Sequence, residues 1–355
     1  MQVKIFKVNE KDMWNEFVAR HLESPVLQSF EWGVLKSFYG WKPIRLGIMD
    51  EGNLVAGASI LIKEIPFLKR SIFYAPRGPV VDFRNHAAFN LLINAIRFKA
   101  DEHKAIVFKM DPDLAEKDVG SILAIKKAGF DFVRKQVQPR TTYVIDLEQD
   151  LEKILMGFEE KTRYNVRLAE KKGVTVVEDL SDSGLQTFYR MYRETAARDR
   201  FLIHPLEYYQ QVKETVLEAG KGTIFFAHYN NQPVAAVVVF AFGRKVWYMY
   251  GASLTSFRNV MPNHALHWQV IQWAKKRGYK LYDLWGIPSD PTPDHPLWGV
   301  YRFKKGFGGK QVKNIGMCDL PLNPILYRLF DRGLVMWQNL RSLIKKGKIV
   351  DSLGE

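Results

Sequence analysis

The sequence predicts an α/β (α+β) protein of two similar domains, each a mixed β-sheet flanked by helices. Three observations predict this fold class. The chain has 355 residues, which is more than one compact core usually takes. Apolar residues make up 47% of it and are spread along its whole length, as in a globular protein. Most directly, one order of predicted elements occurs twice, about 180 residues apart.

The first copy of the repeat starts with a β-hairpin, because two apolar, β-branched runs flank the turn Asp50-Glu51-Gly52-Asn53. A third strand, an amphipathic helix and a fourth strand follow it. The predicted ranges are 44–49, 54–62, 71–74, 86–103 and 105–110.

The second copy repeats this order around the turn Asn230-Asn231-Gln232-Pro233. Its strands are predicted at 223–229, 234–242, 245–250 and 280–285, and its helix at 262–277. Helices also precede each hairpin, at 12–20 and 31–39 in one copy and at 185–198 and 206–219 in the other. Helices, three strands, a helix and a strand is the order of the N-acetyltransferase (GNAT-like) fold. The sequence therefore predicts two tandem GNAT-like domains.

We place these domains at residues 1–147 and 148–317, because the predicted strand 143–147 closes the first copy. The segment 318–355 has no place in the second copy and is expected to pack back on the first domain. Its part from Pro324 to Lys348 mixes leucines and a tryptophan with arginines and lysines. An amphipathic basic helix on the inner face of the membrane is the alternative.

The net charge of +14 favours polyanionic partners, although solubility alone explains many basic proteins. No apolar run approaches the roughly 20 residues that cross a bilayer, and the first residues lack a signal-peptide pattern. The single cysteine, Cys318, forms no intrachain disulfide. These features predict a cytoplasmic protein.

The usual coenzyme A loop of this fold is missing. N-acetyltransferases hold the pyrophosphate in a Q/R-x-x-G-x-G/A loop at a helix N-terminus. Gly251-Ala252-Ser253 and Arg77-Gly78-Pro79 stand at the corresponding places, and neither fits. His264 and His267 have no cysteine or carboxylate close in sequence, so no metal site is predicted. The fold indicates acyl transfer, but with no cofactor and with another acyl donor.

Five stretches resemble the Fem peptidyltransferases (the FemABX family), tRNA-dependent enzymes that build the side branches of peptidoglycan. They are Leu27–Gly33, Tyr74–Val80, Lys161–Ala169, Pro262–Trp273 and Tyr301–Gly309, in order along the chain. Some members carry a long helical arm in the second domain. Residues 147–173 leave room for only one helix and a turn, so the chain resembles the compact type.

The resemblance implies transfer of an amino acid from aminoacyl-tRNA to the stem-peptide amine of a peptidoglycan precursor. The acceptor would be lipid II or UDP-MurNAc-pentapeptide, with contact to the inner membrane face. Two alternatives stay open. One is an N-acyltransferase that uses coenzyme A or acyl carrier protein, and the other is a Fem-like binding or immunity factor without catalysis.

Two residues are candidates for the chemistry. Lys305 matches the family's lysine near the reacting ester, where it would stabilise the oxyanion or receive phosphates of the tRNA 3′ end. Its alternative is a solvated lysine on a basic loop. Asp111 follows the last strand of the first copy, so it would serve as the general base. Its alternative is a turn residue before Pro112.

Other residues are candidates for substrate binding. The resemblance assigns Lys36 and Arg198 to the diphosphate of the acceptor, and solvation of a helix end is the alternative for Arg198. Arg77 is a further candidate cation, because the backbone can approach a ligand at the neighbouring Gly78. Tyr248 and Tyr250 would line the peptide channel, and Tyr301 and Phe303 would stack on the terminal adenine. The alternative for all four is a place in the core. Tyr301 and Phe303 are expected on one strand with Lys305. The tRNA candidates are Arg163, Arg167, Lys171, Lys172 and Lys304.

Overall fold

The computed structural model describes residues 1–66 and 68–331 and divides the chain into two compact units. Unit 1 contains Met1–His21, Pro25–Arg140 and the described residues from Asn314 onward. Unit 2 contains Leu22–Ser24 and Thr141–Lys313. Within the described ranges, every helix is too short or too polar to serve as a membrane span.

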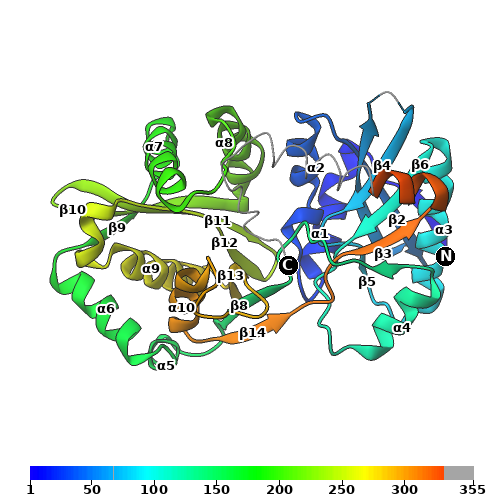
Figure 1. The fold of residues 1–355 in the computed structure, drawn as a ribbon. Helices are drawn as coiled ribbons and strands as arrows, with labels where there is room; N and C mark the ends of the chain where they lie inside the picture. Colours follow the sequence, from blue (N-terminus) through cyan, green and yellow to red (C-terminus); the bar gives the residue numbers. More distant parts are fainter. Residues whose placement is uncertain (67, 332–355) are drawn as a thin grey trace. The chain divides into compact units, whose positions relative to one another are not determined.

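Unit 1 is built on an eight-stranded mixed sheet (Figure 1). Its helices are η1 (Val8–Glu10), α1 (Lys11–Arg20), η2 (Val26–Gln28), α2 (Phe30–Ser37), α3 (His86–Glu102) and α4 (Val119–Lys127). Its strands are β1 (Gln2–Ile5), β2 (Lys42–Asp50), β3 (Asn53–Ile65), β4 (Arg70–Ala75), β5 (Val80–Val81), β6 (Ala105–Met110), β7 (Asp131–Phe132) and β15 (Cys318–Pro321). The strand order is β1-β2-β3-β4-β6-β15-β7, with β5 paired to β3. Among the described strands of this unit, only β4 and β6 pair in parallel.

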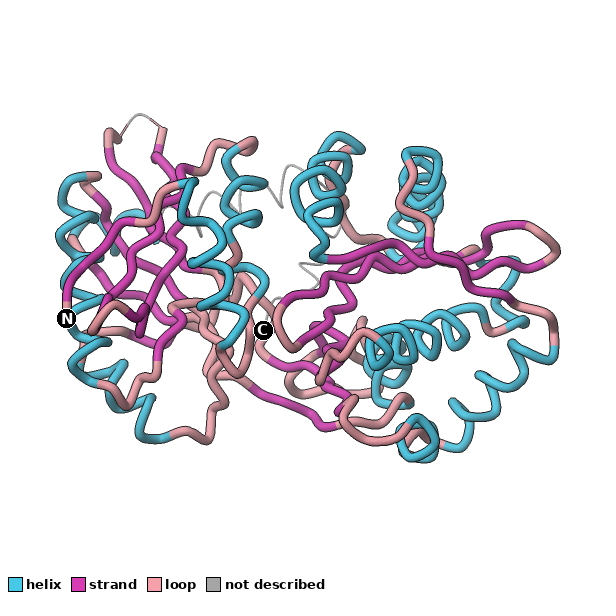
Figure 2. Tube along the Cα trace, turned by 180° about the vertical axis from the view of Figure 1, so that it is seen from behind, coloured by secondary structure: helices cyan, strands magenta, loops and turns pink. Residues whose placement is uncertain are grey.

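Unit 2 is built on a seven-stranded mixed sheet. Its helices are α5 (Leu151–Met156), α6 (Glu160–Lys171), α7 (Asp182–Asp199), α8 (Leu206–Val212), the π-helix η3 (Lys213–Lys221), η4 (Thr255–Val260), α9 (Pro262–Lys276) and α10 (Trp298–Gly306). Its strands are β8 (Thr141–Asp146), β9 (Thr175–Glu178), β10 (Gly222–Tyr229), β11 (Gln232–Phe242), β12 (Lys245–Ser253), β13 (Leu281–Ile287) and β14 (Lys310–Lys313). The order is β14-β8-β13-β12-β11-β10-β9, and only β12 and β13 are parallel. Helices α7 and α8 cover one face of this sheet, and α9 and α10 cover the other (Figures 1 and 2).

The predicted duplication is confirmed by the strand topology. The paths β2-β3-β4-β6 and β10-β11-β12-β13 have the same order, and each contains the single parallel pair of its sheet. Both hairpins turn through two residues with positive φ, Glu51 (47°) and Gly52 (81°) in one and Asn230 (50°) and Asn231 (61°) in the other. Such turns match the twist of the strands and favour Gly and Asn, which is why the sequence marked them.

The strand predicted to close the first domain lies instead in the second sheet. Residues 141–146 form β8, which pairs with β13 on one side and β14 on the other. Unit 1 receives β15 in the equivalent place, beside β6. The alternating pattern of a strand shows that it is a strand but not which sheet edge it joins. The predicted domain boundary, after residue 147, therefore lies later in the chain than the observed one, after Arg140.

Two further predictions differ from the structure. Residues 301–305 are not a strand but part of helix α10. The alternation of Tyr301 and Phe303 resembles that of a strand. Trp298, Tyr301 and Lys304, however, are spaced three residues apart, as on one side of a helix. Residues 147–173 hold two short helices, α5 and α6, where one helix and a turn were expected. The predicted amphipathic tail lies mainly outside the described residues, which end at 331.

Candidate active site

The second sheet opens where β12 and β13 part. These parallel strands pair at Lys245–Leu281, Val246–Tyr282 and Trp247–Asp283, and their pairing ends there. Beyond that point β12 continues beside β11 to Ser253, and β13 continues beside β8 to Ile287. The backbones of the two strands are therefore free of each other over their last residues.

Lys304 of α10 occupies this opening. Its side chain is buried, its ammonium donates a hydrogen bond to the carbonyl oxygen of Gly286 (2.8 Å), and it lies 5.4 Å from the centre of the Tyr248 ring. Burial lowers the pKa of Lys304 to about 7, although the nearby Asp283 carboxylate acts in the opposite direction. An amine with that pKa exists in both protonation states near neutral pH, which suits proton donation and charge stabilisation.

Asp283 is fixed by the strand that carries it. Its Oδ1 accepts hydrogen bonds from the Thr142 hydroxyl of β8 and from the backbone N–H of Trp285 (2.8 Å). Trp285 has a φ of 61°, which is unusual for a tryptophan, and the register of β13 against β8 shifts between Asp283 and Gly286. This irregularity brings the Gly286 carbonyl to the lysine.

Neutral aromatic groups form the rest of the surroundings of Lys304. The ring of His267 lies 4.6 Å from that of Tyr248, and its Nδ1 is 2.8 Å from the Tyr282 hydroxyl. Burial, with a smaller effect of the Lys304 charge, lowers the pKa of His267 to about 3, so this imidazole is neutral at pH 7. Burial also raises the pKa of Tyr248 to about 12. Lys304 is thus surrounded by groups that carry no charge of their own, apart from Asp283.

A β-bulge separates the two tyrosines predicted to line one channel. Val238 pairs with Tyr250 and Val239 with Tyr248, so Met249 has no partner on β11. Because of this extra residue, the side chains of Tyr248 and Tyr250 point to opposite faces of the sheet. Tyr248 packs against His267 of α9, whereas Tyr250 packs against Tyr192 of α7 (6.0 Å) and Tyr209 of α8 (5.4 Å) on the other face. The structure therefore does not bring Tyr248 and Tyr250 into one lining.

The two adjacent lysines of α10 have different surroundings. Lys305, the predicted catalytic lysine, is exposed, and Lys304, predicted as a surface contact for tRNA, is the buried one. A buried amine held by a carbonyl is not placed to contact an RNA backbone, so the geometry assigns the inner position to Lys304. Phe303 packs on the rings of His264 (5.4 Å) and His267 (5.3 Å), and Tyr301 stacks on Trp298 (5.3 Å).

In unit 1, Asp111 follows β6 and is buried. Its Oδ2 accepts a hydrogen bond from the Tyr74 hydroxyl (2.8 Å), and its Oδ1 accepts one from the backbone N–H of Arg77 (2.7 Å). Burial raises the pKa of Asp111 to about 6, against the opposing effects of the Arg77 charge and these hydrogen bonds. The carboxylate is ionised at pH 7 and accepts a proton more readily than an exposed aspartate.

Arg77 supports this carboxylate from the same loop. It has a φ of 53°, and its guanidinium contacts the Asp113 carboxylate (2.9 Å) and the carbonyl oxygen of Pro139 (2.7 Å). The side chain is buried. These contacts indicate that Arg77 holds the loop around Asp111, in contrast to the expected direct grip on a phosphate.

The two cations predicted to bind the acceptor diphosphate lie in different units. Lys36 of α2 is half-buried with its ammonium 4.5 Å from the Trp32 ring, and burial lowers its pKa to about 8. Arg198 of α7 makes a two-pronged contact with Asp199 (2.8 Å for each) and donates to the Ser253 carbonyl oxygen (2.6 Å). The bonds to Asp199 raise the pKa of Arg198.

The cations predicted on α6 divide into two groups. Arg163 donates to the carbonyl oxygens of Met156 (3.0 Å) and Phe158, so it closes the end of α5. Lys172 donates to the carbonyl oxygen of Asn259 (3.0 Å). Arg167 and Lys171 are exposed. Only these last two keep the free surface position that a phosphate contact needs.

Sequence reasoning missed Tyr74, Gly286 and Asp283. Tyr74 stands in the motif Tyr74–Val80 and could have been found there as a partner for Asp111. The carbonyl of Gly286 leaves no sequence signal. No group of residues in the described ranges could hold a metal ion.

Comparisons with known proteins identify the family of the chain. The profile of the FemAB family matches residues 10–221 and 218–332. The lipid II:glycine glycyltransferase of Staphylococcus saprophyticus is 27% identical over 97% of this chain and 98% of its own. The enzyme of the same name from Staphylococcus aureus is 27% identical over 89% of this chain and 92% of its own. The alignment to the first enzyme spans 415 positions, more than the 355 residues here, so that relative has residues which this chain lacks.

Solved structures give the same result. A crystal structure of FemX superposes with a TM-score of 0.87 at 26% identity and covers 93% of this chain and 99% of its own. A tandem GNAT protein from the clavulanic acid biosynthesis pathway has a TM-score of 0.54 at 11% identity, covering 91% and 99%, which shows the fold alone. The predicted pair of GNAT-like domains is thus confirmed.

Proposed function

Because the chain belongs to the FemAB family of aminoacyltransferases, we propose that it transfers an amino acid from aminoacyl-tRNA to the stem-peptide amine of a lipid-linked peptidoglycan precursor. The observation that carries this proposal is the buried Lys304 amine, at the point where β12 and β13 part. The names of the two staphylococcal relatives support a lipid-linked acceptor over a nucleotide-linked one.

The reaction needs no covalent intermediate on the enzyme. The acceptor amine attacks the ester carbonyl of aminoacyl-tRNA, so that a C–N bond forms and the C–O bond to the terminal ribose breaks. The attacking nitrogen loses a proton, and the ribose oxygen gains one. The protein must therefore accept a proton, stabilise the oxyanion and protonate the leaving oxygen.

Lys304 suits the last two tasks. In its ammonium form it would stabilise the oxyanion and then donate a proton to the ribose oxygen. Its pKa of about 7 makes that transfer easier than it is for an ordinary lysine. The neutral His267 and Tyr248 keep the surroundings apolar, which strengthens the interaction with a developing charge.

Asp111 suits the first task. It is ionised at pH 7, and its raised pKa of about 6 makes it a better base than an exposed aspartate. Arg77 and Tyr74 would hold the carboxylate in place. Lys36 and Arg198 remain the proposed contacts for the diphosphate of the precursor, and Arg167 and Lys171 those for the tRNA backbone.

A transfer assay tests the proposal. The protein is incubated with a panel of charged tRNAs and lipid II, and the mass of the precursor is read. We expect the mass of one amino acid to be added with at least one tRNA. In parallel, acetyl-coenzyme A replaces the charged tRNA. Acetylation of the precursor in that arm, with no product from any tRNA, would contradict the proposal and favour a coenzyme A-dependent transferase.

A further inference from the structure

A hollow of about 550 Å³ lies in unit 1, between the β3–β4 hairpin and the loop that precedes β6. The two loops are tied together through Ser71. Its backbone N–H donates to the Lys104 carbonyl oxygen (3.3 Å), and its hydroxyl donates to the His103 carbonyl oxygen (2.9 Å). These two bonds join the beginning of β4 to the loop before β6 at the hollow.

Cationic side chains exceed free carboxylates around it. The charged or ionisable residues that line the hollow are Lys69, Arg70, His103, Lys104, Glu64 and Glu102. Both glutamates already have a lysine partner outside the lining: Lys42 lies 2.6 Å from Glu64, and Lys99 lies 2.8 Å from Glu102. Over residues 1–66 and 68–331, no carboxylate pairs with Lys69, Arg70 or Lys104. The exposed Asp101 stands three residues before Lys104.

An exposed apolar side chain stands next to these cations in the sequence, and another lies on the neighbouring helix α3. Leu68 precedes Lys69 and is 57% exposed, and Phe98 lies one turn before Glu102 on α3 and is 65% exposed. The β3–β4 hairpin projects from the sheet in both views (Figures 1 and 2). An RNA backbone would use the cations but would leave an aliphatic side chain in water. A bilayer surface uses both, because it offers anionic headgroups above an apolar layer.

We propose that the face formed by Leu68, Lys69, Arg70 and Lys104, named here the basic hairpin face, docks on a membrane surface that contains anionic phospholipid. It is separate from the transfer site. Lys104 precedes β6 and Asp111 follows it, and the six residues of that strand span about 20 Å. If the proposed function holds, the bilayer-bound acceptor would reach Asp111 with its stem peptide extended away from the membrane.

Vesicle binding without any acceptor tests this proposal independently of the transfer reaction. The full chain is sedimented with vesicles of phosphatidylcholine alone or with phosphatidylglycerol added. We expect binding only to the anionic vesicles. The triple variant Lys69→Gln, Arg70→Gln, Lys104→Gln should bind about 100-fold more weakly, since each basic residue near such a surface contributes roughly fivefold.

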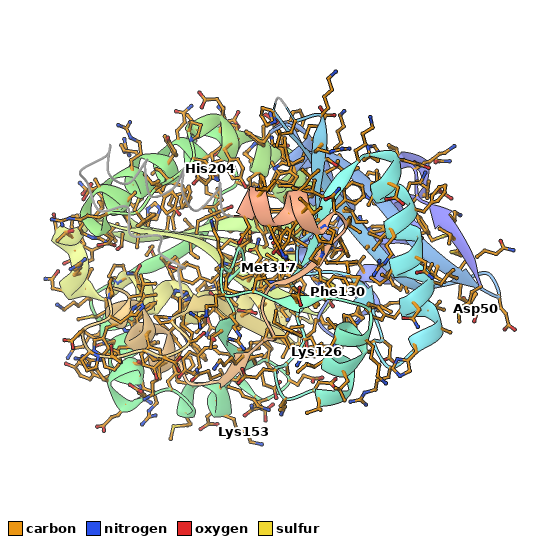
Figure 3. The ribbon with its side chains drawn as sticks, turned by 45° about the vertical axis from the view of Figure 1, so that its right-hand side comes forward. Asp50, Lys126, Phe130, Lys153, His204 and Met317 are labelled. Atoms are coloured by element: carbon orange, nitrogen blue, oxygen red, sulfur yellow. The ribbon has the colours of Figure 1, made fainter. Side chains whose placement is uncertain are left out.

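Helix α4 offers matched controls in the same unit. Lys117, Lys126 and Lys127 are exposed lysines at or near it, and Lys126 is labelled in Figure 3. Their replacement by Gln removes the same charge and should leave vesicle binding within about twofold of the wild type. Leu68→Asp should weaken binding at least ~10-fold, whereas Leu123→Asp, at a site 51% exposed, should not.

Two results would overturn the proposal. One is equal vesicle binding by the basic-hairpin triple variant and the α4 triple variant. The other is loss of tRNA affinity, with no loss of vesicle affinity, in the basic-hairpin variant, which would make the face an RNA surface. The far-UV circular dichroism spectrum and the thermal unfolding midpoint serve as the folding control, and both should be the same in all variants.

Discussion

The equivalent strand pairs of the two units end differently. In unit 1 the parallel pairing of β4 and β6 runs from Ser71–Ala105 to Ala75–Met110, the last residues of both strands. In unit 2 the pairing of β12 and β13 ends at Trp247–Asp283, and both strands continue apart. The parallel strands thus stay paired to their last residues in the first copy, named here the closed end, and separate before their last residues in the second, named here the open end. The two copies share their strand order, and local irregularities at Met249 and Trp285 accompany the separation of β12 and β13.

The two strand ends also carry opposite ionisable groups. Asp111 lies at the closed end with its pKa raised to about 6, and Lys304 lies in the opening with its pKa lowered to about 7. Burial disfavours the charged form in both cases, so it moves the acid and the amine toward neutrality from opposite sides. In the proposed reaction, Asp111 would accept a proton and Lys304 would donate one.

The largest effect is expected from the open end. Lys304→Ala should lower kcat by about 1,000-fold, the upper range for loss of one oxyanion-stabilising group. Lys305→Ala, one residue further along α10, should cost no more than about threefold because its side chain is exposed. Transfer to lipid II under single-turnover conditions measures both. If Lys305→Ala proved the more damaging change, the structural assignment of the inner lysine would be wrong and the sequence-based one right.

The closed end should give the next largest effect. Asp111→Asn should lower kcat/KM by about 100-fold, as for the loss of a general base. The wild-type rate should rise with pH through about 6, as Asp111 ionises, and fall above about 7, as Lys304 loses its proton. Asp111→Asn should lose the acidic limb and keep the alkaline one. A profile with both limbs intact in Asp111→Asn would remove this residue from the proton transfer.

Sequence alone predicted the duplicated strand order, because the residue types at the turns encode the hairpins. The turns at Glu51-Gly52 and Asn230-Asn231 require positive φ, which Gly and Asn adopt easily, so both hairpins were found. The position of Asp111 at a strand end was also predicted. The pairing of β8 was not, because it joins residues more than 130 positions apart, at Asp283 and Val144.

The inner lysine could not be predicted for a different reason. Lys304 and Lys305 are adjacent, and which of them points inward depends on the rotation of α10 about its axis. The opening that receives Lys304 lies beside a bulge at Met249, and no residue type marks that bulge. The same bulge places Tyr248 and Tyr250 on opposite faces, although strand periodicity predicts a common face.

A smaller effect tests the geometry of the open end. A Cβ added at Gly251 would overlap the Tyr248 hydroxyl, so Gly251→Ala should displace that ring from Lys304 and lower kcat by about tenfold. Removal of the hydroxyl in the double variant Gly251→Ala, Tyr248→Phe should restore part of the activity, because the closest overlap is gone. Tyr248→Phe alone serves as the control. Additive losses in the double variant would show that Gly251 acts elsewhere.

The smallest effect is expected from Tyr74→Phe at the closed end. The Tyr74 hydroxyl donates to Asp111 and favours its charged form, so removal of the hydroxyl should raise the pKa of Asp111 further. The maximal rate should change by no more than about threefold, while the acidic limb of the pH profile moves to higher pH. Rates measured from pH 5 to about 8 with wild type and variant decide this. A limb that moves to lower pH, or a uniform loss at every pH, would show that Tyr74 only supports packing. The direction of the shift thus separates an electrostatic role at Asp111 from a structural one, which a single rate at pH 7 could not do.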